Sequence, residues 1–477
     1  MRALDGTGHA KRLARGRSRG ARRGPLAAAL TALLMLGCLL GLAATASAAP
    51  LDSSAEALLA RLALQQSELT AAAGAAADIF GSSVAISGDT ALVGAPLHDT
   101  AGAADAGAAY VFVRSAGSWT QQAKLTAADG AAHDSFGYSV ALSGDTALVG
   151  ASRHDTAGLA DAGAAYVFTR SGGSWTQQAQ LTAGAAGDIF GGSVALSGET
   201  ALVGAVRHDS GGAADAGAAY VFTRSAGSWT QQALLIADAG AAGDMFGNSV
   251  ALSGETALVG ARFHDTVGKA DAGAAYVFTR SGDSWTLQPT LIAADGSADD
   301  QFGYSVALSG AEALVGARFH DTGGQAEAGA AYVFTRSAGS WTPQQTLTAA
   351  AGSAGDSFGT SVALSGATAL VGAPTHDNAG QADAGAAYIF LSVPAITKLL
   401  PASGKRGALV TISGSGFGAA RGANSVKFGT RKCTTYLSWS AAQIKCRVPA
   451  TAKIGKVKVT VTTAAAVSNA KSFTVKR

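Results

Sequence analysis

Six copies of a His-Asp pair recur along the chain, and their side chains are the ones best suited to chemistry. The pairs are His98-Asp99, His154-Asp155, His208-Asp209, His264-Asp265, His320-Asp321 and His376-Asp377, and each is followed six residues later by a further acid (Asp105, Asp161, Asp215, Asp271, Glu327 and Asp383). Imidazole and carboxylate groups bind divalent cations and cationic ligands. The candidate metal ligands are therefore Asp99, Asp105, Asp155, Asp161, Asp209 and Asp215.

The same residues have a structural interpretation, which their repetition favours. Asp accepts hydrogen bonds from backbone N–H groups in turns, and a contact that joins neighbouring loops is needed in every copy of a repeat. A ligand site needs only one or a few copies. We therefore expect the His-Asp pairs to stabilise loops, and we predict no metal site and no catalytic residue among them.

A repeat of about 56 residues organises most of the chain. The dipeptide Phe-Gly begins at Phe80, Phe136, Phe190, Phe246, Phe302 and Phe358. Within each repeat, short apolar runs such as "SVAIS", "TALVGA", "GAAYVF" and "SWTQQAKLT" are separated by Gly-rich turns, which predicts four strands. Gly88-Asp89 suits a two-residue turn between the first two strands. Four antiparallel strands per repeat indicate the blade of a β-propeller.

The two ends of the repeat array complement each other. The last repeat stops after "GAAYIF", whereas "LALQQSELTA" before the first Phe-Gly matches the fourth strand without its Trp. We expect residues 64–70 to pair with residues 387–391, so that an N-terminal strand closes a six-bladed propeller. Closure would remove the exposed sheet edges of an open array.

The order "FG…SVA…ALVGAP", at residues 80–96 and nearly intact at 358–374, resembles the FG-GAP repeats of integrin alpha-subunit propellers and, more closely, those of secreted bacterial proteins. The similarity covers residues 60–393 and implies a propeller. In that family a D-x-D-x-D-G loop between the first two strands holds calcium. Here the loop is shortened to "SGDT", "SGET", "SGAE" or "SGAT", so the integrin-type calcium loops are absent and we expect no cofactor.

Catalysis needs groups that break the symmetry of the repeats, and the sequence offers none that stands out. Trp119, Trp175, Trp229, Trp285 and Trp341 share one position of the fourth strand, where packing is favoured over sugar stacking. We expect the protein not to be an enzyme. An unrepeated cluster of carboxylate, His, Tyr or Arg at the mouth of the propeller funnel would favour a secreted hydrolase or lyase instead.

The amino end has the pattern of a secretory signal. Eight Lys and Arg precede residue 24, and an apolar run at residues 26–44 is followed by "TASAAP". This order predicts a signal peptide at residues 1–48, cleaved near Ala48, and a secreted or cell-surface protein without a membrane span after cleavage. An uncleaved anchor is the alternative, since the run of roughly 19 residues is long enough to cross a bilayer.

Charge divides the exported part of the chain. Residues 49–394 hold 12 Lys and Arg against 31 Asp and Glu, whereas residues 395–477 hold 15 Lys and Arg and no acid. The basic segment favours an anionic cell-wall polymer, a polysaccharide or a surface protein as partner. Intracellular nucleic acid does not suit an exported protein. Alternatively, these charges only solvate the domain or face the acidic propeller.

Short alternating strands after Pro394, beginning "PAITKLLPASGKRGALVTISGSGFG", indicate a β-sandwich. Residues 394–477 resemble an IPT/TIG domain, an immunoglobulin-like module. Cys433 and Cys446 lie 13 residues apart, on segments expected to be neighbouring strands. Because small exported domains often contain a disulfide, we expect one between them, although two buried thiols are the alternative.

The fold expected is all-β: a six-bladed β-propeller closed by an N-terminal strand, followed by an Ig-like sandwich. The function expected is that of an exported, non-catalytic adhesion or ligand-binding protein. The alternatives are a polysaccharide-active hydrolase or lyase that uses the propeller funnel, and a structural matrix protein. A failure to bind any glycan, wall fraction or cell surface would favour the matrix protein.

Overall fold

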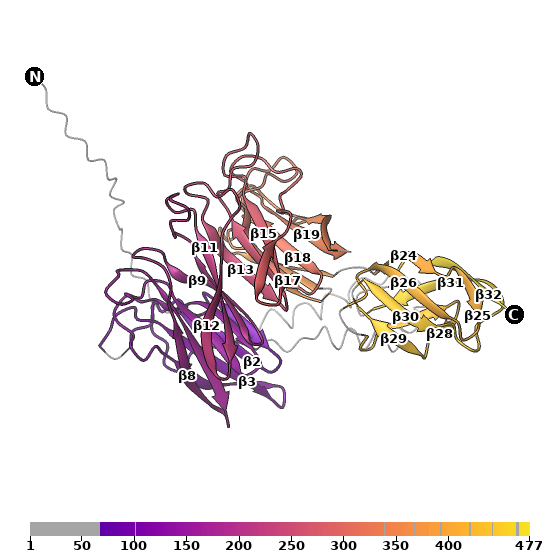
Figure 1. The fold of residues 1–477 in the computed structure, drawn as a ribbon, viewed down its shortest axis with the longest axis horizontal. Helices are drawn as coiled ribbons and strands as arrows, with labels where there is room; N and C mark the ends of the chain where they lie inside the picture. Colours follow the sequence, from indigo (N-terminus) through magenta and orange to yellow (C-terminus); the bar gives the residue numbers. More distant parts are fainter. Residues whose placement is uncertain are drawn as a thin grey trace, which may run out of the picture. The chain divides into compact units, whose positions relative to one another are not determined.

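A computed structural model describes residues 67–100, 102–337, 339–366, 368–378, 380–391, 394–418, 421–440, 442–463 and 467–477. The regular elements in these ranges are all β-strands, which confirms the expected fold class (Figure 1). No helix in the described ranges could span a membrane. The predicted signal peptide, residues 1–48, lies outside the described residues.

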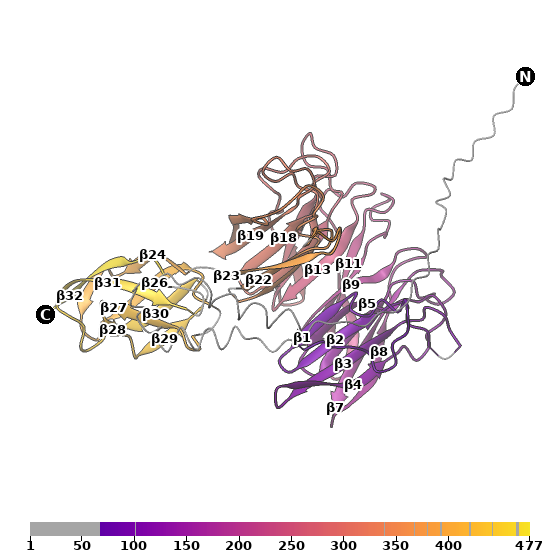
Figure 2. The same ribbon diagram turned by 180° about the vertical axis from the view of Figure 1, so that it is seen from behind.

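Six antiparallel sheets follow one another along the repeat region, as Figure 2 shows for the first sheet, β1 to β4. The first three sheets consist of β1 (Val84–Ser87), β2 (Thr90–Ala95), β3 (Ala108–Ser115), β4 (Ser118–Leu125), β5 (Phe136–Ser143), β6 (Thr146–Ala151), β7 (Ala164–Ser171), β8 (Ser174–Leu181), β9 (Phe190–Ser197), β10 (Thr200–Ala205), β11 (Ala218–Ser225) and β12 (Ser228–Leu235). The last three consist of β13 (Phe246–Ser253), β14 (Thr256–Ala261), β15 (Ala274–Ser281), β16 (Ser284–Leu287), β17 (Phe302–Ser309), β18 (Glu312–Ala317), β19 (Ala330–Ser337), β20 (Ser340–Leu347), β21 (Ser361–Ser365), β22 (Thr368–Ala373) and β23 (Ala386–Leu391).

The first five blades have the four strands that the sequence predicts. In the first blade, Gly88 has a φ of 58° in the two-residue turn between β1 and β2. β2 is buried along its whole length, whereas side chains of β4 alternate between exposed and half-buried. One face of the outer strand β4 is therefore exposed to solvent, whereas the second strand, β2, lies in the interior of the propeller.

Neighbouring blades pack face to face through apolar side chains. Leu92 and Val111 of the first blade share a buried cluster with Val149 and Tyr166 of the second. Corresponding positions form the clusters between the later blades. Because each fully buried Leu or Val contributes about 1.5–3 kcal/mol, these clusters stabilise the array.

The Phe-Gly dipeptide joins each blade to the one before it. The ring of Phe136 is 1% exposed and lies 5.5 Å and 5.9 Å from the rings of Tyr166 and Phe168. Gly137 has a φ of 93°, and a Cβ there would overlap the carbonyl oxygen of Ala108 in the first blade. Phe fills the core of its blade, and Gly lets the two backbones approach.

The last sheet has three strands in the described part of the chain. Of the expected fourth strand, residues 64–66 lie outside the described residues and residues 67–70 form no strand. Leu69 nevertheless packs against Val93 and Tyr110 of the first blade, as Leu125 packs against the second blade. Leu69 thus has the place of a residue that ends the fourth strand of a preceding blade.

Apolar side chains are exposed on the outer faces of the first and last blades. Val84 and Ile86 are 69% and 68% exposed, and Ile389 is 69% exposed. Their counterparts Val140 and Val167 in the second blade are 8% and 0% exposed. Closure of the ring would bury these faces against each other, and it stays a prediction.

The segment after the propeller forms a sandwich of two sheets. The sheets are β24–β26–β30–β29 and β25–β32–β31–β27–β28. Their strands are β24 (Ala395–Leu400), β25 (Ser403–Lys405), β26 (Leu409–Ser415), β27 (Ser425–Phe428), β28 (Arg431–Lys432), β29 (Tyr436–Trp439), β30 (Gln443–Arg447), β31 (Gly455–Thr462) and β32 (Lys471–Lys476). One buried cluster that contains Ile412, Phe428, Val459 and Phe473 fills the space between the sheets.

Candidate functional site

Each His of the repeated pairs contacts a buried Asp that lies two residues before Phe-Gly. His98 Nδ1 is 2.7 Å from Asp78 Oδ2, and His154 Nδ1 is 2.8 Å from Asp134 Oδ2. The other four blades repeat the contact at 2.7–2.8 Å. Because an ionised carboxylate only accepts hydrogen bonds, the Nδ1–H of His donates.

The same buried Asp also holds its own loop. Asp78 Oδ2 accepts a hydrogen bond from the N–H of Ala75 at 2.8 Å, and the corresponding bond occurs in the other five blades. Burial alone would raise the pKa of Asp78, but the hydrogen bonds from Ala75 and His98 outweigh it, and the pKa is lowered. The charged carboxylate is thus stabilised inside the loop.

The six candidate metal ligands are also used within their loops. The Oδ1 of Asp99 accepts the N–H of Asp105 at 2.9 Å, and the pairs Asp155–Asp161 and Asp209–Asp215 repeat this bond at 3.0 Å and 2.9 Å. The second member of each pair has a φ near 50°, a conformation that Asp tolerates. These hydrogen bonds support the structural interpretation of the His-Asp pairs, and the expectation that the loops hold no metal stays a prediction. Among the described residues no group of His, Cys, Asp or Glu is arranged to hold a metal ion.

The second ring nitrogen of these His residues has partners that differ between blades. His98 Nε2 lies 2.6 Å from Lys124 Nζ. His154 Nε2 lies 3.2 Å from Gln180 Nε2, which also contacts the hydroxyl of Tyr166. Of the two ring nitrogens, Nδ1 keeps the same partner in every blade, and each His ring also lies 5.8–6.1 Å from the ring of a Tyr of its own blade.

The repeated Trp residues pack between blades rather than facing solvent as a binding surface. The Nε1–H groups of Trp175, Trp229 and Trp285 donate to a Gln of the preceding blade at 2.9–3.0 Å. Arg170 stacks on Trp175 with its guanidinium 5.3 Å from the ring centroid. The packing interpretation is confirmed.

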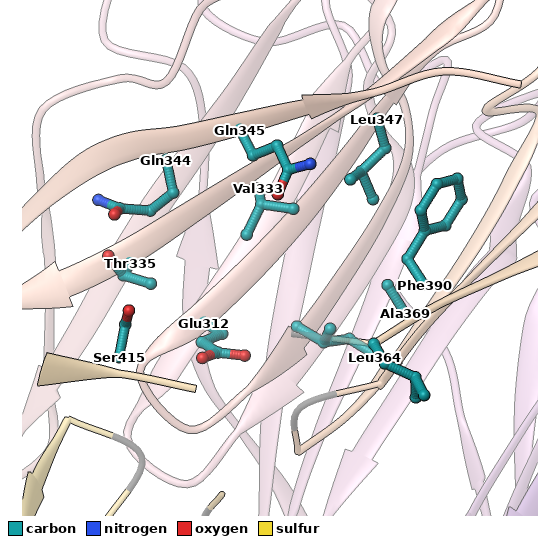
Figure 3. Close-up of a pocket in the computed structure, with 11 residues that line it drawn as sticks. Glu312, Val333, Thr335, Gln344, Gln345, Leu347, Leu364, Ala369, Phe390 and Ser415 are labelled. Carbon is teal, nitrogen blue, oxygen red and sulfur yellow. The ribbon is translucent and has the colours of Figure 1, made fainter. Parts of the chain in front are cut away.

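One pocket of about 390 Å³ lies beside the fifth and sixth blades. The described residues of the sixth blade include no counterpart of the Trp that the fourth strands of the other blades carry. Glu312 lines it together with Val333, Thr335 and Leu364 (Figure 3). The second strands of the other blades begin with Thr at the position of Glu312. Glu312 is 7% exposed, and burial raises the pKa of its carboxyl.

A group of Arg and aromatic side chains lies where the second strands of two neighbouring blades end and a first strand begins. Arg262 follows β14, Arg318 follows β18, and Tyr304 lies near the beginning of β17. The guanidinium groups of Arg318 and Arg262 lie 4.0 Å and 5.4 Å from the centroid of the Tyr304 ring. Sequence reasoning missed this group because the three residues are distant from one another in the chain.

Lysines gather on one face of the sandwich. In the sheet β25–β32–β31–β27–β28, exposed Lys456 and Lys458 alternate with buried core residues of β31. The register pairs Lys427 with Lys432 and Lys405 with Lys476 across neighbouring strands. We call these six residues the lysine face: Lys405, Lys427, Lys432, Lys456, Lys458 and Lys476. The domain has no Asp or Glu to neutralise it.

The expected disulfide is not formed. Cys433 and Cys446 are free thiols, both buried in the sandwich core. Cys446 lies in β30, but Cys433 precedes β29 instead of lying in it. The Sγ of Cys433 donates a hydrogen bond to the carbonyl oxygen of Arg447 at 3.0 Å. The two cysteines therefore pack as small apolar residues, and the hydrogen bond to Cys433 together with burial raises the pKa of Cys446.

Comparison with protein families agrees with this arrangement. An FG-GAP repeat model matches residues 64–112, 119–168, 175–222, 229–278, 285–334 and 341–390. The chain belongs to the FG-GAP repeat family. An IPT/TIG domain model matches residues 394–475, so the FG-GAP propeller is followed by an IPT/TIG sandwich.

Other comparisons add no function to this FG-GAP protein. No curated protein matches the chain. A similar solved structure is a fungal alcohol oxidase of the AA5 family in complex with copper, at 14% identity, with 83% of this chain and 85% of that chain covered and a TM-score of 0.38. At that score the likeness supports no conclusion about fold or activity.

Proposed function

We propose that this FG-GAP protein is exported and acts as a non-catalytic adhesion or ligand-binding protein of the cell surface, with an anionic polymer as its partner. The lysine face carries the proposal. Lys427 lies opposite Lys432, and Lys405 lies opposite Lys476. Like charges directly opposite each other destabilise a sheet, and an anionic polymer laid across the face would neutralise them.

The sequence supports the remaining parts of the proposal. The basic, apolar and small-residue order of residues 1–48 is that of a secretory signal. The His-Asp pairs are hydrogen-bonded inside their blades, which supports a non-catalytic role for the repeat loops. An exported basic domain suits a wall polymer or an acidic polysaccharide better than intracellular nucleic acid.

Binding of the full-length exported protein to polygalacturonate tests this proposal. We expect binding that weakens as salt is raised, because exposed charges are screened. Fully methyl-esterified pectin has the same sugar ring without the charge, and we expect it not to bind. Equal binding to both polymers, or no binding to polygalacturonate or to an isolated cell-wall fraction, would contradict the proposal. The last result would favour a structural matrix protein.

A polysaccharide hydrolase or lyase is the second candidate, and the unrepeated group of Arg262, Arg318 and Tyr304 favours it. Arg and Tyr stabilise developing negative charge in many active sites. Hydrolysis of polygalacturonate would release reducing ends, and a lyase would give an unsaturated product with ultraviolet absorbance. We expect neither product after prolonged incubation with the protein. The appearance of either product would show that the protein is an enzyme and would contradict the proposal of a non-catalytic binding protein.

A further inference from the structure

Arg262 and Arg318 break the symmetry of the propeller at one position. In each blade this position follows the Gly-Ala that ends the second strand, and the other blades have Pro96, Ser152, Val206 and Pro374 there. Each of the two arginines is followed by a Phe, which is Phe263 or Phe319. Two neighbouring blades therefore share an Arg-Phe pair that the other four lack at this position.

Tyr304 lies close to both guanidinium groups. The guanidinium of Arg318 is 4.0 Å from the Tyr304 ring centroid and 4.2 Å from that of Phe319. The guanidinium of Arg262 is 5.4 Å from the Tyr304 ring and 4.8 Å from that of Phe263. Stacking on rings orients a guanidinium and leaves the N–H groups at its edge free to donate hydrogen bonds to a further partner.

Polar contacts from neighbouring strands fix the group. Arg318 Nε donates to Gln301 Oε1 at 3.0 Å. Asn248 Oδ1 accepts the backbone N–H of Arg262 at 3.2 Å, and Asn248 Nδ2 donates to the carbonyl oxygen of Tyr304 at 2.9 Å. Because these bonds hold the backbone and one guanidinium in place, a ligand would lose little affinity to ordering the site.

The two arginines form no direct salt bridge with a carboxylate of the described residues. Arg114, Arg170, Arg224 and Arg280 each pair with an Asp or Glu. Arg262 and Arg318 have no such pair in the described ranges, and the buried Nε of Arg262 has no hydrogen-bond partner there. Burial lowers the pKa of Arg318, and the charge of Arg262 lowers it further, which together outweigh the opposite effects of Tyr304 and Glu327. An unpaired, partly buried charge is costly unless a ligand compensates it.

We propose that Arg262 and Arg318 form a binding site for the carboxylate of an acidic sugar, flanked by Tyr304. The proposal rests on the proposed function for the class of polymer. A planar guanidinium matches a carboxylate in a two-pronged pair, and aromatic rings suit the apolar face of a sugar ring. A nucleic acid would bring closely spaced phosphates to the acidic propeller, which disfavours it.

Binding of trigalacturonate to the full-length protein, measured by titration calorimetry, tests the site. We expect Arg262→Gln with Arg318→Gln to weaken binding at least about tenfold, since hydrogen bonds between charged partners are among the strongest. The matched control is Arg153→Gln with Arg207→Gln, which removes the same charge from exposed positions in the second and third blades. We expect that control to change the affinity less than about twofold.

Further variants distinguish binding at this site from binding at the lysine face. We expect Lys427→Gln, Lys456→Gln and Lys458→Gln together to weaken trigalacturonate binding several-fold less than the arginine double variant does, because a short ligand reaches only part of the lysine face. Arg318→Lys keeps the charge without the guanidinium and serves as a milder variant if the double variant does not fold; we expect it to weaken binding. Unchanged affinity in the arginine variants, or equal binding of the methyl ester of trigalacturonate, would overturn the site. Polymer binding that persists without trigalacturonate binding would overturn the site but leave the proposed function standing.

Discussion

His154 and Asp134 form a buried pair in the second blade, with Nδ1 and Oδ2 separated by 2.8 Å and both residues less than a tenth exposed. The same Asp oxygen accepts the N–H of Ala131 at 2.8 Å. One carboxylate therefore connects the loop after β6 to the loop before β5. Because every blade has the same two bonds, the pair is a unit of the fold.

Replacing Asp134 by Ala is expected to lower the free energy of unfolding by about 1–3 kcal/mol, since His154 would stay buried without its acceptor. Urea unfolding measures this loss. The control is Asp145→Ala, which removes an exposed partner of Arg170 and is expected to cost less than about 1 kcal/mol. Equal losses in the two variants would contradict the structural role of the buried pair.

Millimolar calcium is expected to leave the melting temperature nearly unchanged. A ligand stabilises a protein only if it binds the native state, and Asp99 and its counterparts already accept backbone N–H groups. Differential scanning calorimetry with calcium and with chelator measures the effect. A rise of several degrees that Asp99→Ala and the equivalent substitutions abolish would show a cation site.

The blade and its His-Asp pair could be predicted because both depend on contacts between residues that are close together in the chain. The turn at Gly88, the buried second strand and the hydrogen bond between Asp99 and Asp105 involve residues close together in the chain. The sequence repeats with a period of about 56 residues, so the same turns, strands and loop hydrogen bonds are expected in each blade. Every copy of the pair makes the same His–Asp contact, as its repetition in the sequence predicts.

Glu312→Thr restores the residue type of the other blades and is expected to raise the free energy of unfolding at pH 7 by about 1–3 kcal/mol, because a buried carboxylate without a partner is costly. Burial raises the pKa of Glu312 above the unfolded value of 4.5. Wild-type stability therefore falls as pH rises from that value through the folded pKa, and the advantage of Thr is largest above it.

Urea unfolding of the two proteins at pH 4 and pH 7 measures the effect of Glu312→Thr. We expect the difference to shrink at the lower pH, where the carboxyl is protonated in both states. A variant less stable than the wild type at pH 7 would mean that Glu312 has a partner outside the described residues.

Closure of the propeller can be tested with a cysteine pair. In the first blade Val111 is the cross-strand partner of Ala123, and Ile389 and Ser67 have the corresponding places in the repeat. We expect Ser67→Cys with Ile389→Cys to form a disulfide within one chain, because cross-strand neighbours lie within bonding reach.

The control for closure is Ser67→Cys with Val267→Cys, since Val267 is fully exposed on a loop of the fourth blade. Mass spectrometry of unreduced peptides detects the bond. Free thiols in the first variant would contradict closure, and a disulfide between two chains would show that the open ends pair with a second copy.

The lysine face and the arginine site could not be predicted, because their residues meet only through strand register. Lys405, Lys427 and Lys476 lie far apart in the sequence, and the pairing of β25 with β32 and of β27 with β28 brings them to one sheet. The disulfide prediction was wrong for a different reason. The two cysteines are neighbours, since their side chains are hydrogen-bonded to each other, but both are free thiols, and Cys433 Sγ donates a hydrogen bond to the carbonyl oxygen of Arg447.

Polygalacturonate binding by two matched triple variants is the most direct test of the proposed function. One variant replaces Lys427, Lys456 and Lys458 of the lysine face by Gln, and the other replaces Lys398, Lys445 and Lys453, which lie outside that face, by Gln. Both lose the same net charge. We expect the first to weaken binding by about tenfold or more and to reduce its salt dependence, and the second to weaken it about twofold or less. Equal losses would mean that only net charge matters, and unchanged binding in both would contradict the lysine face as the binding surface.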